Sequence, residues 1–134
     1  MLKTCAQLFV DDLNAKEMNF HSGNDGDVSY IEFPYKGKVA KLFFNGDQGE
    51  YLSIYLVYEH IPEEKFADMI LTCNELNCMY KWVTFYVDND SDLIFHDDAI
   101  LSVENAADEA FELLVRILKI GDEVKPKIMK TIYA

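Results

Sequence analysis

The sequence predicts one α+β domain over residues 1–134, in the order αβββαββα, with a mainly antiparallel five-stranded sheet and helices packed on one face. Apolar residues at three-to-four spacing predict helices near both ends and in the middle of the chain. Alternating segments rich in Val, Ile, Tyr and Phe predict strands between them. The short connections between these strands favour antiparallel pairing, and no linker or repeat divides the 134 residues.

The first predicted element is a short helix over residues 2–14. Its apolar side chains fall on one stripe, formed by Leu2, Cys5, Ala6, Phe9 and Leu13. The segment that follows, "HSGNDGD" at residues 21–27, is a cluster of turn-forming residues, and we expect it to be a loop.

Three strands are expected next, in "VSYIEFP", "KVAKLFF" and "YLSIYLVY". They are separated only by "YKG" and "NGDQGE", which suit tight turns. Strands joined so closely should form an antiparallel meander.

The second helix is expected to start at Pro62, because Pro is tolerated at the first helical position, where Glu63 and Glu64 also suit the helix dipole. We expect Asn77 to end this helix in a left-handed conformation. The predicted buried face consists of Phe66, Met69, Ile70, Cys73 and Leu76.

Two further strands, "KWVTFYVD" and "DLIFHDDAIL", precede the last helix. Ser102 is a candidate cap for that helix, and Glu104 suits its first turn. We expect Gly121 to interrupt or loosen the helix, and Pro126 to start a final turn. The predicted buried stripe consists of Ala107, Ala110, Phe111, Leu114, Ile117 and Leu118.

The charge balance narrows the classes of partner. With 24 acidic and 12 basic residues, the formal net charge is −12, which disfavours binding to nucleic acid and to anionic membranes. Solubility explains this charge, and so does a preference for basic partners or cations.

The chain shows no convincing signal peptide or membrane span, and its three cysteines form no CxxC motif, so we expect a cytoplasmic protein with reduced thiols.

The outer face of the predicted sheet is aromatic. Alternation places Phe43, Tyr55, Trp82 and Tyr86 on the face away from the helices. Cross-strand aromatic pairs stabilise a half-exposed sheet, but an apolar patch with polar tips also suits a docking or dimer surface. We therefore take these four residues as the candidate partner-binding site, for another protein or for a second copy of the chain.

The stretch "DNDSDLIFHDD", residues 88–98, begins like an EF-hand calcium loop, with Asp88, Asp90 and Asp92 at positions 1, 3 and 5. Position 6 is Leu93 where the motif needs Gly, and position 12 is Ala99 where it needs Glu. The flanks alternate as strands. The pattern therefore predicts a solvated β-hairpin turn, and we expect no metal site.

No catalytic motif stands out. The three histidines are scattered, with no HExxH or HxH pair, and the chain contains neither GxSxG nor a phosphate loop. Asp98 shares a strand face with His96, where an edge ion pair is expected. We therefore predict a non-enzymatic binding module without a cofactor. The alternative is a small enzyme, or a ligand- or cation-binding protein, that uses an acidic surface cleft containing a histidine.

Three stretches resemble the YbjN-like family of small bacterial proteins described as sensory transduction regulators. They are "HIPEEKFADMILTCNELN", "WVTFYVDNDSDLIFHDDAIL" and the tail "KPKIMKTIYA". The resemblance extends from about Val28 to the end of the chain. It implies a fold like that of type III secretion chaperones and a regulatory or chaperone-like module of the bacterial cytoplasm, often dimeric. It implies no catalytic residue.

Overall fold

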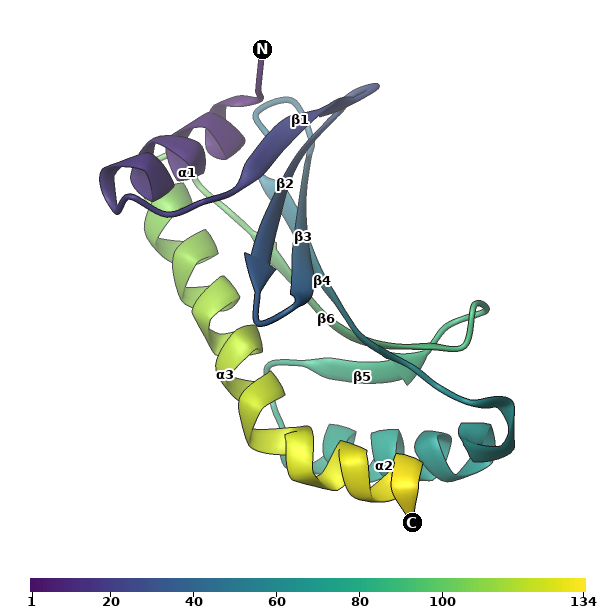
Figure 1. The fold of residues 1–134 in the computed structure, drawn as a ribbon. Coiled ribbons are helices and arrows are strands. Elements are labelled where there is room, and N and C mark those ends of the chain that lie inside the picture. Colours follow the sequence, from purple (N-terminus) through teal and green to yellow (C-terminus); the bar gives the residue numbers. More distant parts are fainter.

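The helices and strands form an α+β structure with an open, six-stranded sheet (Figure 1). The computed structural model describes residues 1–134. The α-helices are α1 (Thr4–Ala15), α2 (Phe66–Met79) and α3 (Ala106–Tyr133), with a 3-10 turn, η1 (Glu63–Lys65), before α2. The strands are β1 (His21–Asp25), β2 (Val28–Tyr35), β3 (Lys38–Asn45), β4 (Tyr51–His60), β5 (Thr84–Val87) and β6 (Asp92–Ile100).

The sheet has the order β1-β2-β3-β4-β6-β5, and every neighbouring pair is antiparallel. The expected five-stranded sheet is wrong by one strand, because residues 21–27, expected as a loop, contain β1. In β1, His21 pairs with Glu32 and Asp25 with Val28. Residues of low strand propensity form a strand here because β2 supplies the pairing, and Gly26, with φ of 62°, makes the tight turn.

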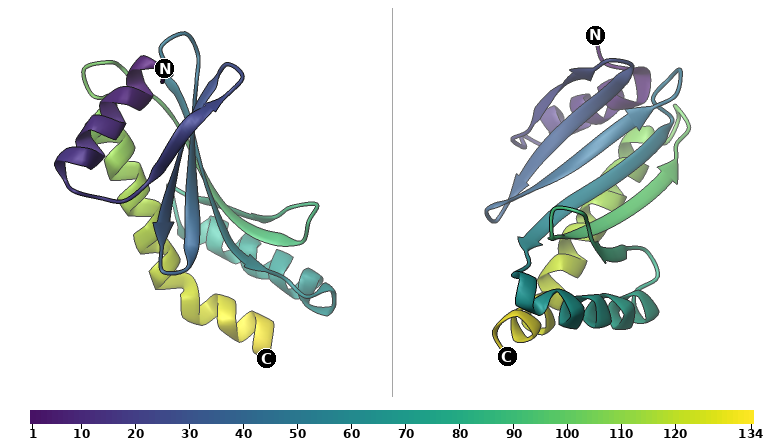
Figure 2. Two further views of the ribbon diagram at one scale, coloured as in Figure 1. Left: turned by 45° about the horizontal axis from the view of Figure 1, so that its top comes forward. Right: turned by 90° about the vertical axis from the view of Figure 1, so that its right-hand side faces the viewer.

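The three α-helices lie on one side of the sheet and leave its other face uncovered, as the sequence predicted (Figure 2). Strand alternation produces the core: Leu52, Ile54 and Leu56 of β4 are all buried on the helix side. A single hydrophobic cluster joins these residues to α1, α2 and α3. None of the helices is both long and apolar enough to cross a membrane.

α3 is one continuous helix of 28 residues, so the expected interruption at Gly121 and the expected new start at Pro126 are wrong. Gly121 is buried, and a Cβ atom there would lie 3.4 Å from the ring of Tyr58. The backbone oxygen of Gly121 accepts a hydrogen bond from the hydroxyl of Tyr58 at 3.0 Å. Pro126 is exposed, so water can satisfy the carbonyl of Asp122 that the missing N–H leaves free. The helix bends in its C-terminal third (Figure 1).

The start of α3 lies three residues later than predicted, and its buried stripe differs from the prediction by about one residue. Ser102 is not the cap, because the helix begins at Ala106; instead the backbone N–H of Ser102 donates to Oδ1 of Asn105. Ala107 and Phe111 are only half-buried, whereas Ala106 and Leu113 are buried. The other predicted core residues, Ala110, Leu114, Ile117 and Leu118, are confirmed as buried.

The predicted buried face of α2 is half right. Met69, Cys73 and Leu76 are buried, but Phe66 and Ile70 are 36% and 46% exposed. The tertiary contacts select a narrower stripe that includes the polar Thr72, whose hydroxyl bonds to that of Thr131 in α3. Pro62 precedes η1, so the α-helix itself starts only at Phe66.

Asn77 does not end α2, which continues to Met79. Its carboxamide turns to β5, where Nδ2 donates to the backbone oxygen of Phe85 at 2.9 Å. The backbone N–H of Phe85 donates to Oδ1 of Asn77 at 2.7 Å. Because β5 is the last strand of the sheet, these two bonds cover its free edge.

Candidate functional site

An aromatic cluster occupies the uncovered face of the sheet. Phe43 of β3 and Tyr55 of β4 meet edge to face, with ring centroids 5.9 Å apart. The ring of Tyr55 stacks on that of His96 in β6 at 4.3 Å, and Tyr86 of β5 approaches His96 at 6.3 Å. Four neighbouring strands therefore each contribute one ring, with His96 joining Tyr55 to Tyr86. We call Phe43, Tyr55, Tyr86 and His96 the sheet-face cluster.

Hydrogen bonds hold His96 in place. Its Nε2 atom lies 2.8 Å from Oδ1 of Asp98, and the hydroxyl of Ser53 donates to the same oxygen at 2.7 Å. The expected His96–Asp98 pair is confirmed, although β6 is an interior strand and not an edge. Partial burial raises the pKa of Asp98, but the bonds from Ser53 and His96 outweigh this effect, and the pKa lies below its ordinary value.

The cluster is half-buried rather than flat on the surface. Ile94, two residues before His96 on the same face of β6, is only 4% exposed, although it lies on the face opposite the core. Partial burial raises the pKa of Tyr86, and the nearby Tyr55 raises it further by a smaller amount. The cluster therefore combines the polar tips of two tyrosines and of His96 with buried apolar surface, as many protein interfaces do.

Trp82 does not join this cluster. It lies in the segment between α2 and β5, two residues before the strand begins, so strand alternation does not set its direction. Its ring packs beside α3, 5.0 Å from the guanidinium of Arg116, and the residue is 50% exposed. The expected position of Trp82 on the outer face is wrong, and its role in partner binding stays a prediction.

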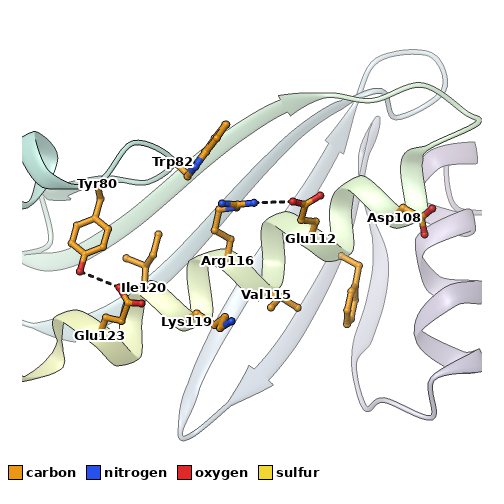
Figure 3. A pocket seen from close by; sticks show the side chains of 10 residues that line it. Tyr80, Trp82, Asp108, Glu112, Val115, Arg116, Lys119, Ile120 and Glu123 are labelled. Carbon is orange, nitrogen blue, oxygen red and sulfur yellow. Dashed lines mark hydrogen bonds and ion pairs between the residues drawn. The ribbon is translucent and has the colours of Figure 1, made fainter.

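Trp82 instead lines a groove of about 610 Å³ between α3 and the 80–82 segment (Figure 3). We call this the α3 groove. Arg116 extends from α3 between Trp82 and Glu112, and its Nη2 atom lies 2.7 Å from Oε1 of Glu112. At the other end, the hydroxyl of Tyr80 donates to Glu123 at 3.2 Å. The groove thus combines aromatic walls with carboxylates.

The acidic stretch from Asp88 forms the predicted hairpin turn. One carboxylate oxygen of Asp88 accepts the backbone N–H groups of Asp90 and Asp92, at 3.0 and 2.9 Å. Ser91 adopts φ of 62°, and β5 and β6 pair on either side. The Asp88 carboxylate is therefore engaged in shaping the turn, as Asp side chains commonly are.

The remaining reactive side chains do not converge. No three His, Cys, Asp or Glu side chains gather closely enough to hold a metal ion. The α3 groove contains acids but no histidine, whereas the acidic-cleft alternative needs both. The cysteines are free, as expected, and burial raises the pKa of the Cys73 thiol to about 11, which keeps it protonated near neutral pH.

Sequence reasoning missed the buried carboxylate of Asp97 and the strand contact of Asn77, which it expected only to end a helix. Asp97 lies on the helix side of β6, and its Oδ2 atom is buried without a hydrogen-bond partner. Burial raises its pKa, while its other oxygen accepts the N–H of Asp98 at 2.9 Å. The alternation of Leu93, Phe95 and Asp97 could have revealed this inward direction. No sequence signal indicates the contact between Asn77 and Phe85.

One family model matches the chain over residues 10–123, and it describes YbjN as "Putative bacterial sensory transduction regulator". The chain belongs to this family. The match confirms the resemblance, but it begins before Val28 and ends before the tail "KPKIMKTIYA", so that tail lies outside the matched region. The description of the YbjN family names a regulator and no reaction.

Proposed function

We propose that this YbjN-family chain is a non-enzymatic regulator that acts by binding another protein through the sheet-face cluster. The observation that supports this proposal is the set of four rings on the one face of the sheet that no helix covers. A chaperone-like action and a location in the cytoplasm are parts of the same proposal.

The chemistry of the cluster suits a protein partner. Tyrosine presents a large apolar surface and a polar tip at a small cost in conformational entropy, and it is enriched in interfaces. The strands fix the backbone beneath it, and the His96–Asp98–Ser53 contacts limit movement of its central ring. A partner would therefore meet a largely preformed surface.

A different protein is favoured over a second copy of the chain. Two copies would each carry a net charge of −12, and such like charges oppose association. Self-association through this face is therefore an outcome that the experiment must be able to detect.

Site-specific photo-crosslinking tests the proposal. A photoreactive phenylalanine analogue at Tyr86 should give a discrete crosslinked protein in cells, and Phe43→Ser should abolish this product. The control is Tyr133→Ser, which removes an exposed aromatic residue at the end of α3, away from the sheet face, and should leave the product intact. Thermal melts check that each variant is folded.

Three results would count against the proposal. These are no product at Tyr86, a product that Phe43→Ser leaves unchanged, and a product that is only a dimer of the chain. Sedimentation of the purified protein identifies the last case.

A further inference from the structure

We propose that the α3 groove binds a basic, arginine-bearing segment of a partner protein. This site is separate from the sheet-face cluster, because Trp82 and α3 lie on the helix side of the molecule. The inference does not depend on what the sheet face binds.

The aromatic rings of the groove already attract cations from the chain itself. The guanidinium of Arg116 lies 5.0 Å from the centre of the Trp82 ring, and the ammonium of Lys81 lies 5.8 Å from it. The ammonium of Lys16 lies 4.4 Å from the centre of the Phe111 ring. Cations are attracted to the faces of such rings, most strongly to tryptophan, so these walls suit a guanidinium or ammonium group.

Carboxylates follow α3 along the same groove. Asp108 and Glu112 are one helical turn apart, and Glu123 lies at the far end. Asp108 forms no ion pair, while Glu112 pairs with Arg116. The whole chain adds a net charge of −12, which steers basic segments towards such sites.

The dimensions fit a short segment of chain. Asp108 and Glu123 are fifteen residues apart on α3, which corresponds to about 22 Å at 1.5 Å per residue. An extended segment of about seven residues spans that length. The α3 groove is therefore long enough for several side chains of a partner.

An acidic ligand is the competing possibility, because Arg116 and Lys119 also line the groove. The guanidinium of Arg116, however, is already bonded to Glu112 and lies against Trp82. An anion would have to displace that carboxylate and approach a strongly negative chain. A basic segment must compete with Arg116 for Glu112 and Trp82, but the net charge attracts it, and Asp108 is free to pair with it.

Trp82 is the only tryptophan of the chain, so intrinsic fluorescence reports directly on this groove. The probe is the acetylated peptide amide Arg-Leu-Arg-Ala-Leu-Arg-Leu, and the matched peptide carries Glu at each Arg position. We expect a saturable change in Trp82 emission with the Arg peptide that weakens with added NaCl. Saturable binding of the Glu peptide in its place, or no change with either peptide, would overturn the inference.

Variants separate local recognition from general attraction between charges. Asp108→Asn with Glu112→Gln should weaken binding of the Arg peptide by about five- to tenfold. The control, Asp25→Asn with Asp47→Asn, changes the net charge equally at exposed positions outside the groove and should weaken it far less. Equal weakening in the two double variants would show only a long-range charge effect. Circular dichroism establishes that both are folded.

Arg116→Gln provides a second, independent test. It removes the nearer of the chain's own two cations from the Trp82 ring and frees Glu112, so the Arg peptide should bind at least as tightly as it binds the wild-type protein. Loss of binding in this variant would mean that Arg116 recognises the ligand, which contradicts the inference.

Discussion

Asn77 gives the sharpest stability prediction, because its carboxamide acts as a substitute for a neighbouring strand. It forms two hydrogen bonds with the backbone of Phe85, at 2.9 and 2.7 Å, on the free edge of β5. We expect Asn77→Ala to remove both bonds. At about 1 kcal/mol of net free energy for each bond, the loss is about 2 kcal/mol.

Helix propensity must be separated from this loss, because alanine favours a helix more than asparagine does. Asn74→Ala is the matched control: Asn74 is an exposed residue one turn earlier in α2, with no side-chain hydrogen bond. The difference between the two variants isolates the contact with β5. For a chain of this length, 2 kcal/mol corresponds to a fall in Tm of about 8 °C.

Urea unfolding and thermal melts of the two variants measure the difference. Asn77→Asp is informative as well, because it keeps the acceptor for the Phe85 N–H but places a carboxylate against the Phe85 carbonyl. We expect it to be no more stable than Asn77→Ala at neutral pH. If Asn77→Ala and Asn74→Ala unfold at the same denaturant concentration, the reasoning about the strand edge is refuted.

Two further substitutions test the interior. Asp97→Asn should raise the free energy of unfolding by about 1 kcal/mol at pH 7, because it removes a charge from a site whose burial raises the carboxyl pKa. A carboxyl whose pKa is raised in the folded state loses stability as the pH rises through that pKa, so the stability gain of Asp97→Asn should vanish near pH 3. Urea unfolding at pH 7 and pH 3 measures this difference. A stability gain that persists at pH 3 would contradict the prediction. Gly121→Ala should raise Tm by about 3 °C, since alanine favours the helix and the added Cβ would lie 3.4 Å from Tyr58, an ordinary contact. A lower Tm would show that the Tyr58 ring cannot accommodate it.

Local patterns were sufficient for most of the fold. Alternation in β4 predicted which of its side chains are buried, because one face of a sheet that carries helices must be apolar. The same argument predicted the outward direction of Phe43, Tyr55 and Tyr86, and the turn chemistry of Asp88 predicted the hairpin. In each case the decisive interactions lie within a strand or a short turn.

The errors occur where distant parts of the chain meet. The turn-forming residues of β1 become a strand because β2 pairs with them. α3 continues through Gly121 because Tyr58, 63 residues away in sequence, contacts that position. Trp82 turns to α3 because it precedes the regular strand, where no periodic rule applies.

By itself, the sequence determined the α+β class, the antiparallel meander, the hairpin at Asp88 and the membership of the YbjN family, because local periodicity and composition carry that information. Only the tertiary structure decided which polar groups meet. It placed Asn77 on the edge of β5, His96 at the centre of the sheet-face cluster and Arg116 over Trp82. These contacts join residues from different elements, and their free energy depends on relative positions that no local pattern specifies.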